Sequence, residues 1–426
     1  MKNDTKTNLK EMIELIQKQE LLLPDFQRGF VWDIEMQQRL VASVLTKMPI
    51  GSILVLEADT EDFGCRILGR KDEVDTSGGN RNVNVLLDGQ QRMTTLTLLL
   101  LSLRDYAIQH PEDTTINSRR IDNMLLKNEY EAGDERYKIL LTETDRDILI
   151  RLVESKLIPD GTKSRLIDNY KFFSGKIADR DLRPAEIYES IGKLQIVNIT
   201  LDRTVDDAQA IFESLNSTGK ELSESDLIRN YVLMGLAPSE QTYVYEHLWR
   251  PMEQLFVYET QDSIMDSFFR HYLTMKLVRI PKQGRVYEEF KLYHLNCEFG
   301  TIRELCQDLL NYAKFYTDIV FKRSNRAERK RLYEDIVDLR MEVSYPFLLK
   351  VHNDCAEGVI TEDNLKEILR LCISYVLRRS ICDIPTNSMN KTFATLRNSI
   401  RPDDYMNSVK AFFVLQETYK EFPDDE

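Results

Sequence analysis

The chain has 426 residues, of which 42% are hydrophobic and 30% are charged, a balance typical of ordinary globular proteins with two or three domains. Its formal net charge of -13 argues against a protein that coats DNA without specificity, although a local basic groove stays compatible with it. No stretch approaches the ~18 consecutive apolar residues of a membrane span, and the N-terminus lacks a signal-peptide core, so we expect a cytoplasmic protein with no membrane contact.

The first hundred residues predict helices and strands in an α+β order. Helical spacing of apolar residues, short apolar runs and turn residues delimit the expected elements. In chain order these are a helix over 7–19 capped by Thr7 or Asn8, an extended stretch over 21–25, a helix over 34–47, a strand over 52–57, a polar hairpin or loop over 63–81, a strand over 83–87 and a helix over 90–107. We therefore expect a small sheet accompanied by several helices.

The pattern after residue 119 predicts helices with one strand among them. The expected elements are helices within 119–194, a strand over 196–201, helices over 206–215 and 223–236, and helices throughout the rest of the chain. The sequence GLAPSE at 235–240 is the clearest break between these segments. We predict an α+β domain over residues 1–236 and an all-α domain over residues 237–426.

The segment Asp88-Gly89-Gln90-Gln91-Arg92 stands where a predicted strand ends and a helix begins. A helix N-terminus offers unpaired backbone N–H groups and a positive dipole end, so it attracts anions. Glycine lets the backbone approach a ligand closely, and an arginine can fork onto phosphate oxygens. The structural alternative is that Asp88 only caps the helix and that the two glutamines face solvent.

A second segment, Asp25-Phe26-Gln27-Arg28, is followed by Trp32. Glutamine and arginine beside aromatic rings suit recognition of a nucleotide or base edge, because the ring stacks and the polar groups orient. Taken alone, this segment is better explained by packing of the aromatic side chains with the arginine at the surface.

A third segment, residues 212–220 (FESLNSTGK), invites comparison with a phosphate-binding P-loop. The comparison fails, because Ser214 replaces the first glycine and Glu221 stands where a magnesium-binding hydroxyl is needed. A turn between two helices, with Ser223 as the second cap, explains Gly219 and Asp226. It leaves two residues without an explanation, which are Asn216 and Lys220.

The remaining polar residues form no further motif. The six cysteines include no C-x-x-C pair, and no histidine stands at ligand spacing from a cysteine pair, so we expect no structural zinc site. The basic run at 322–331 (KRSNRAERKR) is better explained as a solvated helix face than as a nucleic-acid site.

These segments together, in this order, resemble the N-terminal domain of the GmrSD family of type IV restriction proteins. The matching pieces are residues 24–28 with Trp32, residues 87–96 (LDGQQRMTTL), and residues 211–222 with Asp226, Arg229 and Asn230. The pentad DGQQR followed by Thr-Thr-Leu is highly specific in that company. The resemblance covers roughly residues 9–234, and the helical remainder matches more loosely.

The resemblance implies a fold, a ligand and a set of site residues. The fold would be ParB/sulfiredoxin-like, and the DGQQR segment would bind and hydrolyse ATP or GTP with Mg²⁺ or another divalent metal, whose protein ligands stay unassigned. Carried over by position, the catalytic residues would be Asp88, Gln91 and Arg92. The nucleotide-binding residues would be Gln27, Arg28, Gly89, Gln90, Asn216, Gly219, Lys220 and Asp226, with Gln27 and Arg28 alternatively reading modified DNA.

Whole proteins of this family typically carry a C-terminal HNH nuclease domain and restrict foreign, often modified, phage DNA. No histidine follows Phe393, so the nuclease motif is absent. We therefore expect either a fragment of a longer protein or a natural subunit that works with a separate HNH nuclease. The expected partners are a nucleoside triphosphate, modified DNA and that nuclease, and pairing into a homodimer is left open.

Three functions follow from these observations. The first is a nucleoside triphosphatase whose turnover controls a DNA endonuclease in anti-phage defence. The second is a sensor that binds modified DNA or a nucleotide without hydrolysing it. The third is a stand-alone ParB-like nuclease, which the lack of a metal-binding histidine cluster disfavours although carboxylates also bind magnesium. We rank them in that order.

Overall fold

A computed structural model divides the chain into two compact units, one formed by Met1–Lys220 with Met234–Thr242 and one formed by Glu221–Leu233 with Tyr243–Glu426. The structure describes residues 2–18, 21–24, 30, 32–46, 48, 50, 52–59, 65–66, 82–139, 141, 143–162, 164–194, 196–202, 222–234, 236–256, 261–297, 299–416 and 420–424. The domain boundary that we predict after residue 236 lies within the short segment that packs with the first unit, whereas the helix before it packs with the second.

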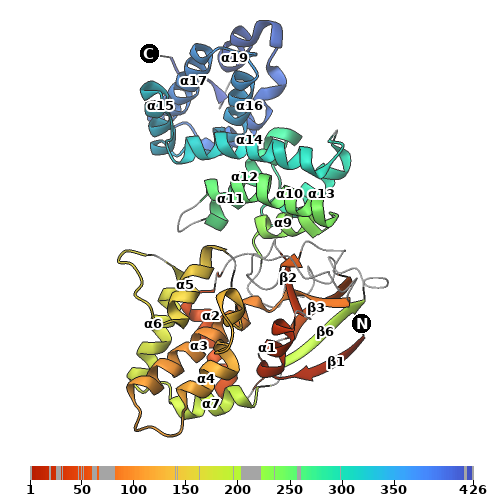
Figure 1. Ribbon diagram of the computed structural model, residues 1–426. Coiled ribbons are helices and arrows are strands. Elements are labelled where there is room, and N and C mark those ends of the chain that lie inside the picture. Colours follow the sequence, from red (N-terminus) through yellow and green to blue (C-terminus); the bar gives the residue numbers. More distant parts are fainter. Residues whose placement is uncertain are drawn as a thin grey trace. The chain divides into compact units, whose positions relative to one another are not determined.

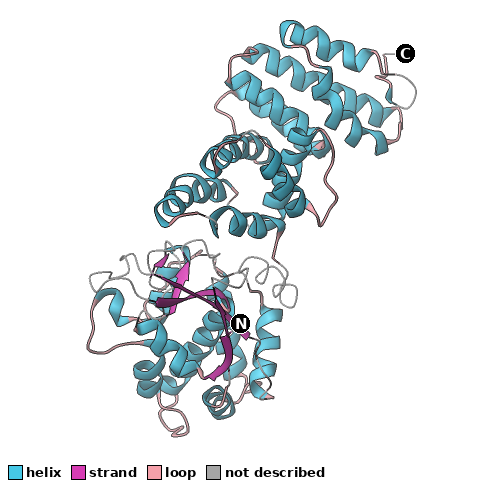
Figure 2. Cartoon of the chain, turned by 90° about the vertical axis from the view of Figure 1, so that its right-hand side faces the viewer, coloured by secondary structure: helices cyan, strands magenta, loops and turns pink. Residues whose placement is uncertain are grey.

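All described strands belong to one six-stranded mixed sheet in the first unit, seen edge-on in Figure 2. The strands are β1 (Lys2–Thr7), β2 (Leu21–Pro24), β3 (Ser52–Asp59), β4 (Cys65–Arg66), β5 (Asn82–Asp88) and β6 (Ile196–Asp202). Their order across the sheet is β1-β6-β3-β5-β2-β4. Two neighbouring pairs are parallel, β6 with β3 and β5 with β2, and the other pairs are antiparallel.

Most helices of the first unit gather on one side of this sheet, around the long helix α3 (Figure 1). The helices of this unit are α1 (Leu9–Gln17), α2 (Ile34–Leu45), α3 (Gln90–Gln109), α4 (Ser118–Ile121), α5 (Glu143–Val153), α6 (Arg165–Ala178) and α7 (Pro184–Gly192), with a π turn η1 (Asp122–Leu126) and a 3-10 turn η2 (Gly133–Arg136). The boundary between the two units falls within α10 (Pro238–Val244). Asn8 caps α1 in a reciprocal capping box with Glu11, as one of the two caps proposed from the sequence. The helix predicted over 206–215 lies outside the described residues.

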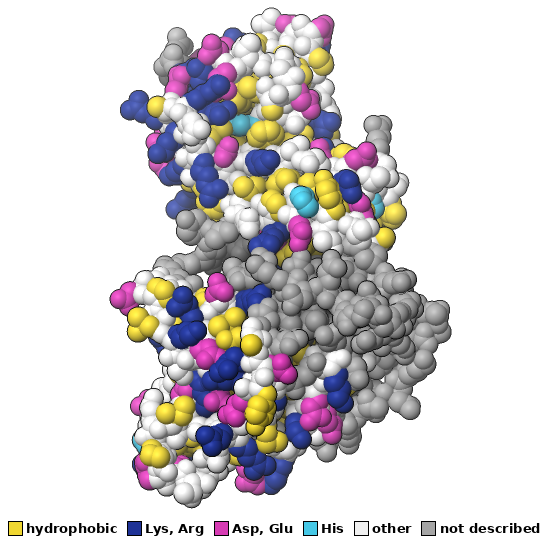
Figure 3. All heavy atoms as spheres, viewed as in Figure 1, with side chains coloured by type: hydrophobic (Ala, Val, Ile, Leu, Met, Phe, Trp, Pro, Cys, Tyr) yellow, Lys and Arg dark blue, Asp and Glu magenta, His cyan; other side chains and the backbone are white. Residues whose placement is uncertain are grey.

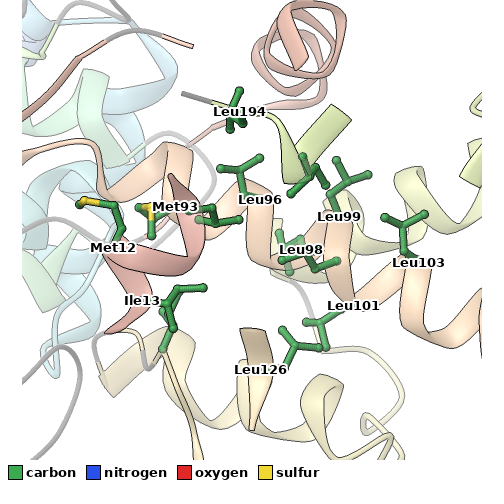
Figure 4. Packing of buried hydrophobic residues seen from close by; sticks show 14 of the residues in the cluster. Met12, Ile13, Met93, Leu96, Leu98, Leu99, Leu101, Leu103, Leu126 and Leu194 are labelled. Atoms are coloured by element: carbon green, nitrogen blue, oxygen red, sulfur yellow. The ribbon is translucent and has the colours of Figure 1, made fainter. Parts of the chain in front are cut away.

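Helix α3 forms the centre of the first unit. Its apolar side chains point in several directions in Figure 4, toward α1, the π turn and the neighbouring helices, and Leu96, Leu98, Leu99 and Leu101 are all fully buried. A helix that is apolar on every side is typically enclosed by the rest of its domain. Because α3 packs against α4, α6 and α7, its N-terminal turn is held by a rigid support.

The second unit contains only helices among its described residues. They are α9 (Glu224–Met234), the π turn η3 (Tyr245–Trp249), α11 (Arg250–Leu255), α12 (Gln261–Leu277), α13 (Val286–Asn296), α14 (Ile302–Val320), α15 (Ala327–Asp338), α16 (Tyr345–Ala356), α17 (Glu362–Ile381), α18 (Met389–Leu396) and α19 (Tyr405–Val414), with short 3-10 turns at Glu342–Ser344, Thr386–Ser388, Arg397–Ser399 and Pro402–Asp404. The predicted fold class, α+β followed by an all-α region, is confirmed. Within the described part of the chain, no helix combines the length and apolar character needed to cross a membrane.

Two histidines are buried inside this helical unit. His352 donates from Nδ1 to the Leu348 carbonyl (2.7 Å), and its Nε2 forms a hydrogen bond with the Tyr333 hydroxyl (2.6 Å). His271 packs against the rings of Tyr316 and Tyr345. Burial lowers the pKa of His352 to about 4 and that of His271 to about 3. Both histidines must therefore gain a proton when the unit unfolds in mild acid.

This burial predicts that the second unit loses stability as the pH falls below 6.5. The unfolded histidines have a pKa near 6.5, so from there down to about pH 4 the unfolded chain binds more protons than the native one. The free energy of unfolding should then fall by about 1.4 kcal/mol per pH unit for each buried histidine. Urea unfolding at several pH values between 7.5 and 5.5 measures this slope of the free energy of unfolding against pH. His271→Phe should make the slope shallower, and His247→Phe, at an exposed position, should leave it unchanged. Equal slopes in all three proteins would contradict the assignment.

Candidate functional site

The sheet brings two of the sequence motifs to the same edge. Strands β2 and β5 are parallel neighbours, with Leu22 opposite Val85, so Pro24 at the end of β2 lies level with Leu87 near the end of β5. The carboxyl ends of parallel strands meet at one edge of a sheet. The chain therefore leaves β2 beside Asp88 and Gly89. The predicted binding residues Gln27 and Arg28 themselves lie outside the described residues.

The turn from β5 into α3 requires a glycine. Gly89 has φ of 120°, a backbone conformation that side-chain-bearing residues rarely adopt. A Cβ atom at this position would stand 2.9 Å from Cγ1 of Ile53, which is fully buried on β3. The position thus excludes a side chain for two independent reasons, and the backbone is left bare at the point where α3 begins.

Gly89 is the N-cap of α3, a helix of 20 residues, and among the described residues no side chain forms the capping hydrogen bond. Its first turn therefore presents backbone N–H groups and the positive end of the helix dipole at the sheet edge. Asp88 is paired with Arg92, one helical turn further on, and does not act as the cap. The Asp88 side chain is 41% exposed, whereas that of Arg92 is 14% exposed and also donates to the Ile50 carbonyl at 3.5 Å. A ligand can reach the carboxylate, and the guanidinium is held in place beside it.

The two glutamines of the motif face the protein. Gln91 accepts a hydrogen bond through Oε1 from the backbone N–H of Trp32 at 3.3 Å, which links the second motif to the first. Gln90 is buried, and its Oε1 has no hydrogen-bond partner in the described part of the chain. The structural alternative, in which Asp88 caps the helix and both glutamines face solvent, is therefore wrong.

Two residues that the sequence did not single out also hold the segment around Trp32. Asp145, in the first turn of α5, accepts from the backbone N–H of Phe30 at 2.8 Å. Asn169 of α6 donates from Nδ2 to the Trp32 carbonyl at 3.0 Å. Burial raises the pKa of the Asp145 carboxyl group, and the hydrogen bond from Phe30 opposes that rise. No sequence signal marks either residue, because each acts on the backbone of a distant segment.

The strand that precedes the third motif in the chain ends at the opposite edge of the sheet. Strand β6 is parallel to β3, with Asp202 opposite Glu57, whereas Asp88 stands opposite Leu54 near the start of β3. The chain therefore leaves β6 at the edge away from the α3 N-terminus. Three predicted binding residues of this motif lie outside the described residues, and they are Asn216, Gly219 and Lys220.

Asp226 belongs to α9, which is part of the second unit. Its carboxylate accepts from the backbone N–H of Ser223 (3.4 Å), and the Ser223 hydroxyl accepts from the backbone N–H of Asp226 (3.1 Å), forming a reciprocal cap. Further along α9, Arg229 is buried and pairs with Glu253 at 3.2 Å. This geometry accounts for Asp226 as a helix cap, and its contact with a nucleotide stays a prediction.

Charged side chains elsewhere are largely paired. On the face of the second unit seen in Figure 3, Lys and Arg side chains are interspersed with Asp and Glu. Within the basic run, Lys322 pairs with Asp338, and both Arg326 and Arg329 pair with Glu362. In the described ranges, no three His, Cys, Asp or Glu side chains converge as a metal-binding group.

Comparison with known proteins places this architecture in a family. Residues 9–233, more than half of the chain, match the GmrSD restriction endonuclease, N-terminal domain. The chain is also 28% identical over 251 residues to an uncharacterized protein of Methanocaldococcus jannaschii, a match that covers 54% of this chain and 41% of that protein. The chain thus spans about two fifths of the length of that relative. The matched region contains both motifs that meet at the sheet edge, and the chain belongs to the GmrSD restriction endonuclease family through its N-terminal domain.

Proposed function

We propose that the N-terminus of α3, with Asp88 and Arg92, binds the phosphates of ATP or GTP, and that hydrolysis there regulates restriction of modified DNA. One observation carries the proposal, which is that the Gly89 turn presents a helix N-terminus with no side-chain cap among the described residues, beside an exposed carboxylate and the partly buried arginine paired with it. Backbone N–H groups at such a terminus are a ready site for phosphate oxygens. The membership of a restriction family supports the regulatory role.

Each residue of the turn has a proposed task. The α3 amides and Arg92 would hold the phosphate oxygens, with the guanidinium exchanging its Asp88 partner for a phosphate. The carboxylate so released fits Mg²⁺, which in proteins is commonly held by one or two carboxylates together with substrate phosphates and waters. Gln91, whose amide orientation is fixed by Trp32, would orient the attacking water.

The wider site rests on the family relationship. Gln27 and Arg28 would contact the nucleotide or read the modified base, since the chain leaves β2 beside Asp88. Asn216, Gly219, Lys220 and Asp226 would complete the nucleotide contacts. The proposed partners are modified DNA and an HNH nuclease, in the same chain or a separate one. A homodimer is a further proposed assembly.

Phosphate release from ATP and GTP with Mg²⁺, measured with and without DNA, tests this proposal. Arg92→Ala and Asp88→Ala should each lower the rate about a hundredfold, because Arg92 would neutralise the developing phosphate charge and Asp88 would hold the Mg²⁺. Arg39→Ala is the control, since Arg39 forms an exposed ion pair with Glu35 on α2 and should release phosphate at the parental rate.

The outcomes separate the candidate functions. Release that survives both substitutions at the parental rate would refute the site. A chain that releases no phosphate, but binds nucleotide or DNA in a way that Asp88→Ala removes, would be the non-hydrolysing sensor. That second function is favoured by the direct link between Gln91 and Trp32, which ties the turn to an aromatic segment suited to base recognition.

A further inference from the structure

The backbone on either side of residue 31 is held by one side chain from each of three helices. Asp145 of α5 accepts from the Phe30 N–H at 2.8 Å, and Asn169 of α6 donates to the Trp32 carbonyl at 3.0 Å. The third contact, at 3.3 Å, joins the Trp32 N–H to Gln91 in the first turn of α3. The orientation of the Gln91 amide therefore depends on the position of the Trp32 backbone. Asn169 of α6 holds that backbone directly, and Asp145 of α5 holds it through Phe30.

Each supporting residue contributes an unfavourable term to the stability of the native chain. The Asp145 carboxyl group has a raised pKa because burial disfavours its charged form. Asn169 is 1% exposed, and its Oδ1 has no hydrogen-bond partner in the described part of the chain. A buried polar atom without a partner costs free energy that an apolar side chain of similar shape would not.

We infer that Asp145 and Asn169 are positioning residues that set the orientation of Gln91 at the α3 turn through the backbone of Phe30 and Trp32. The inference rests on the proposed phosphate site, because it gives Gln91 its task there. Neither residue touches the nucleotide in this arrangement. A displacement of about 1 Å at a group that orients a reactant can lower a rate by about a hundredfold, so a single backbone anchor has a large effect.

The inference predicts lower turnover without lower stability. Asp145→Leu and Asn169→Leu remove the unfavourable buried polar groups but also leave the Phe30 N–H and the Trp32 carbonyl without these partners, so the opposing effects should change the melting temperature little. The rate constant kcat for phosphate release should fall at least tenfold, with KM changed less than threefold, because binding to the α3 amides is untouched. Asp145→Asn should restore kcat, since its amide oxygen still accepts from the Phe30 N–H.

Matched controls stand on the same helices. Asp147, two residues further along α5, and Lys171, two residues further along α6, are exposed. Asp147→Leu and Lys171→Leu make comparable changes outside the anchors and should keep the parental kcat. Hydrogen exchange of the full chain, read in the peptides that contain Phe30 and Trp32, supplies a measurement that needs no activity. The exchange of these amides should accelerate at least tenfold in Asp145→Leu and Asn169→Leu, and not in the controls.

The two measurements distinguish the inference from the proposed function. A parental chain that releases no phosphate refutes the proposed hydrolysis, and the exchange rates then decide whether the two anchors hold Phe30 and Trp32. Unchanged exchange in both leucine variants would overturn the anchoring itself. Faster exchange with parental kcat, or failure of Asp145→Asn to restore kcat, would overturn the positioning role.

Discussion

Replacement of Arg104 by methionine is expected to lower the free energy of unfolding of the first unit by about 3–5 kcal/mol, the range found when one partner of a buried charged network is removed. Arg104 is 1% exposed on α3, and its guanidinium lies among carbonyl, carboxylate and hydroxyl oxygens. Its guanidinium donates to the carbonyls of Leu152 (3.0 Å) and Val153 (2.5 Å), the last two residues of α5. Helix-terminal carbonyls have no partner inside their own helix, so Arg104 acts as the cap of α5 from a neighbouring helix.

The same guanidinium neutralises two carboxylates. It pairs with Asp105 at 2.7 Å and with Asp122 at 3.3 Å, and the two aspartates are 18% and 22% exposed. Methionine fills a similar volume but leaves both carboxylates without this cation and removes the Arg104 donor from the Val153 and Leu152 carbonyls. The loss should reach Asp145, which stands at the opposite end of α5, and so loosen the anchor at Phe30.

Hydrogen exchange in α3 and α5, followed during urea unfolding, measures this effect in the intact chain. Arg183→Met is the control, because Arg183 pairs with Glu186 in an exposed ion pair at 2.9 Å, and such pairs contribute at most about 1 kcal/mol. If the two variants shift the unfolding transition equally, the buried network is not what supports α5.

The order of elements could be predicted because each carries a local signal. Helical spacing and capping residues located α1 and α2, and apolar runs located β3 and β6. Strand β1 was missed, since its sequence KNDTKT has no apolar residue to alternate with polar ones. It pairs only with β6 at the edge of the sheet, and edge strands are often polar and charged.

The candidate site was predictable only in part. The DGQQR turn could be found because a glycine between a strand and a helix, with charges on both sides, is itself a local signal. The pairing of β2 with β5, which brings the first two motifs together, depends on sheet order and has no local signature. Asp145 and Asn169 contact Phe30 and Trp32 across 115 and 137 residues of chain, and each contact is made to a backbone atom. A side chain that bonds to a backbone atom does not require a particular residue type at its partner. Such a contact therefore leaves no recognisable pattern in the amino-acid sequence.

Gly89→Ala adds a single methyl group and is expected to cause a large loss of nucleotide hydrolysis. The backbone φ of 120° costs about 1–3 kcal/mol for a residue with a side chain, and the new Cβ would meet Ile53 at 2.9 Å. Ile53 cannot give way easily, because it is fully buried between the sheet and its helices. The turn must shift instead, and with it the first amides of α3, the Asp88 carboxylate and Arg92, so phosphate release should fall by at least a hundredfold.

A second glycine provides the matched control. Gly175 lies inside α6, where an added Cβ would meet no atom within 4 Å. Gly175→Ala should therefore keep the parental rate and raise the free energy of unfolding by about 0.5–1 kcal/mol, the usual gain from alanine in a helix. Both variants are compared by thermal unfolding and by phosphate release with Mg²⁺. A Gly89→Ala chain that is less stable but hydrolyses nucleotide at the parental rate would show that the turn serves the fold and that the phosphates bind elsewhere. Loss of hydrolysis at temperatures well below its melting transition would instead assign the bare backbone at Gly89 to the phosphate site.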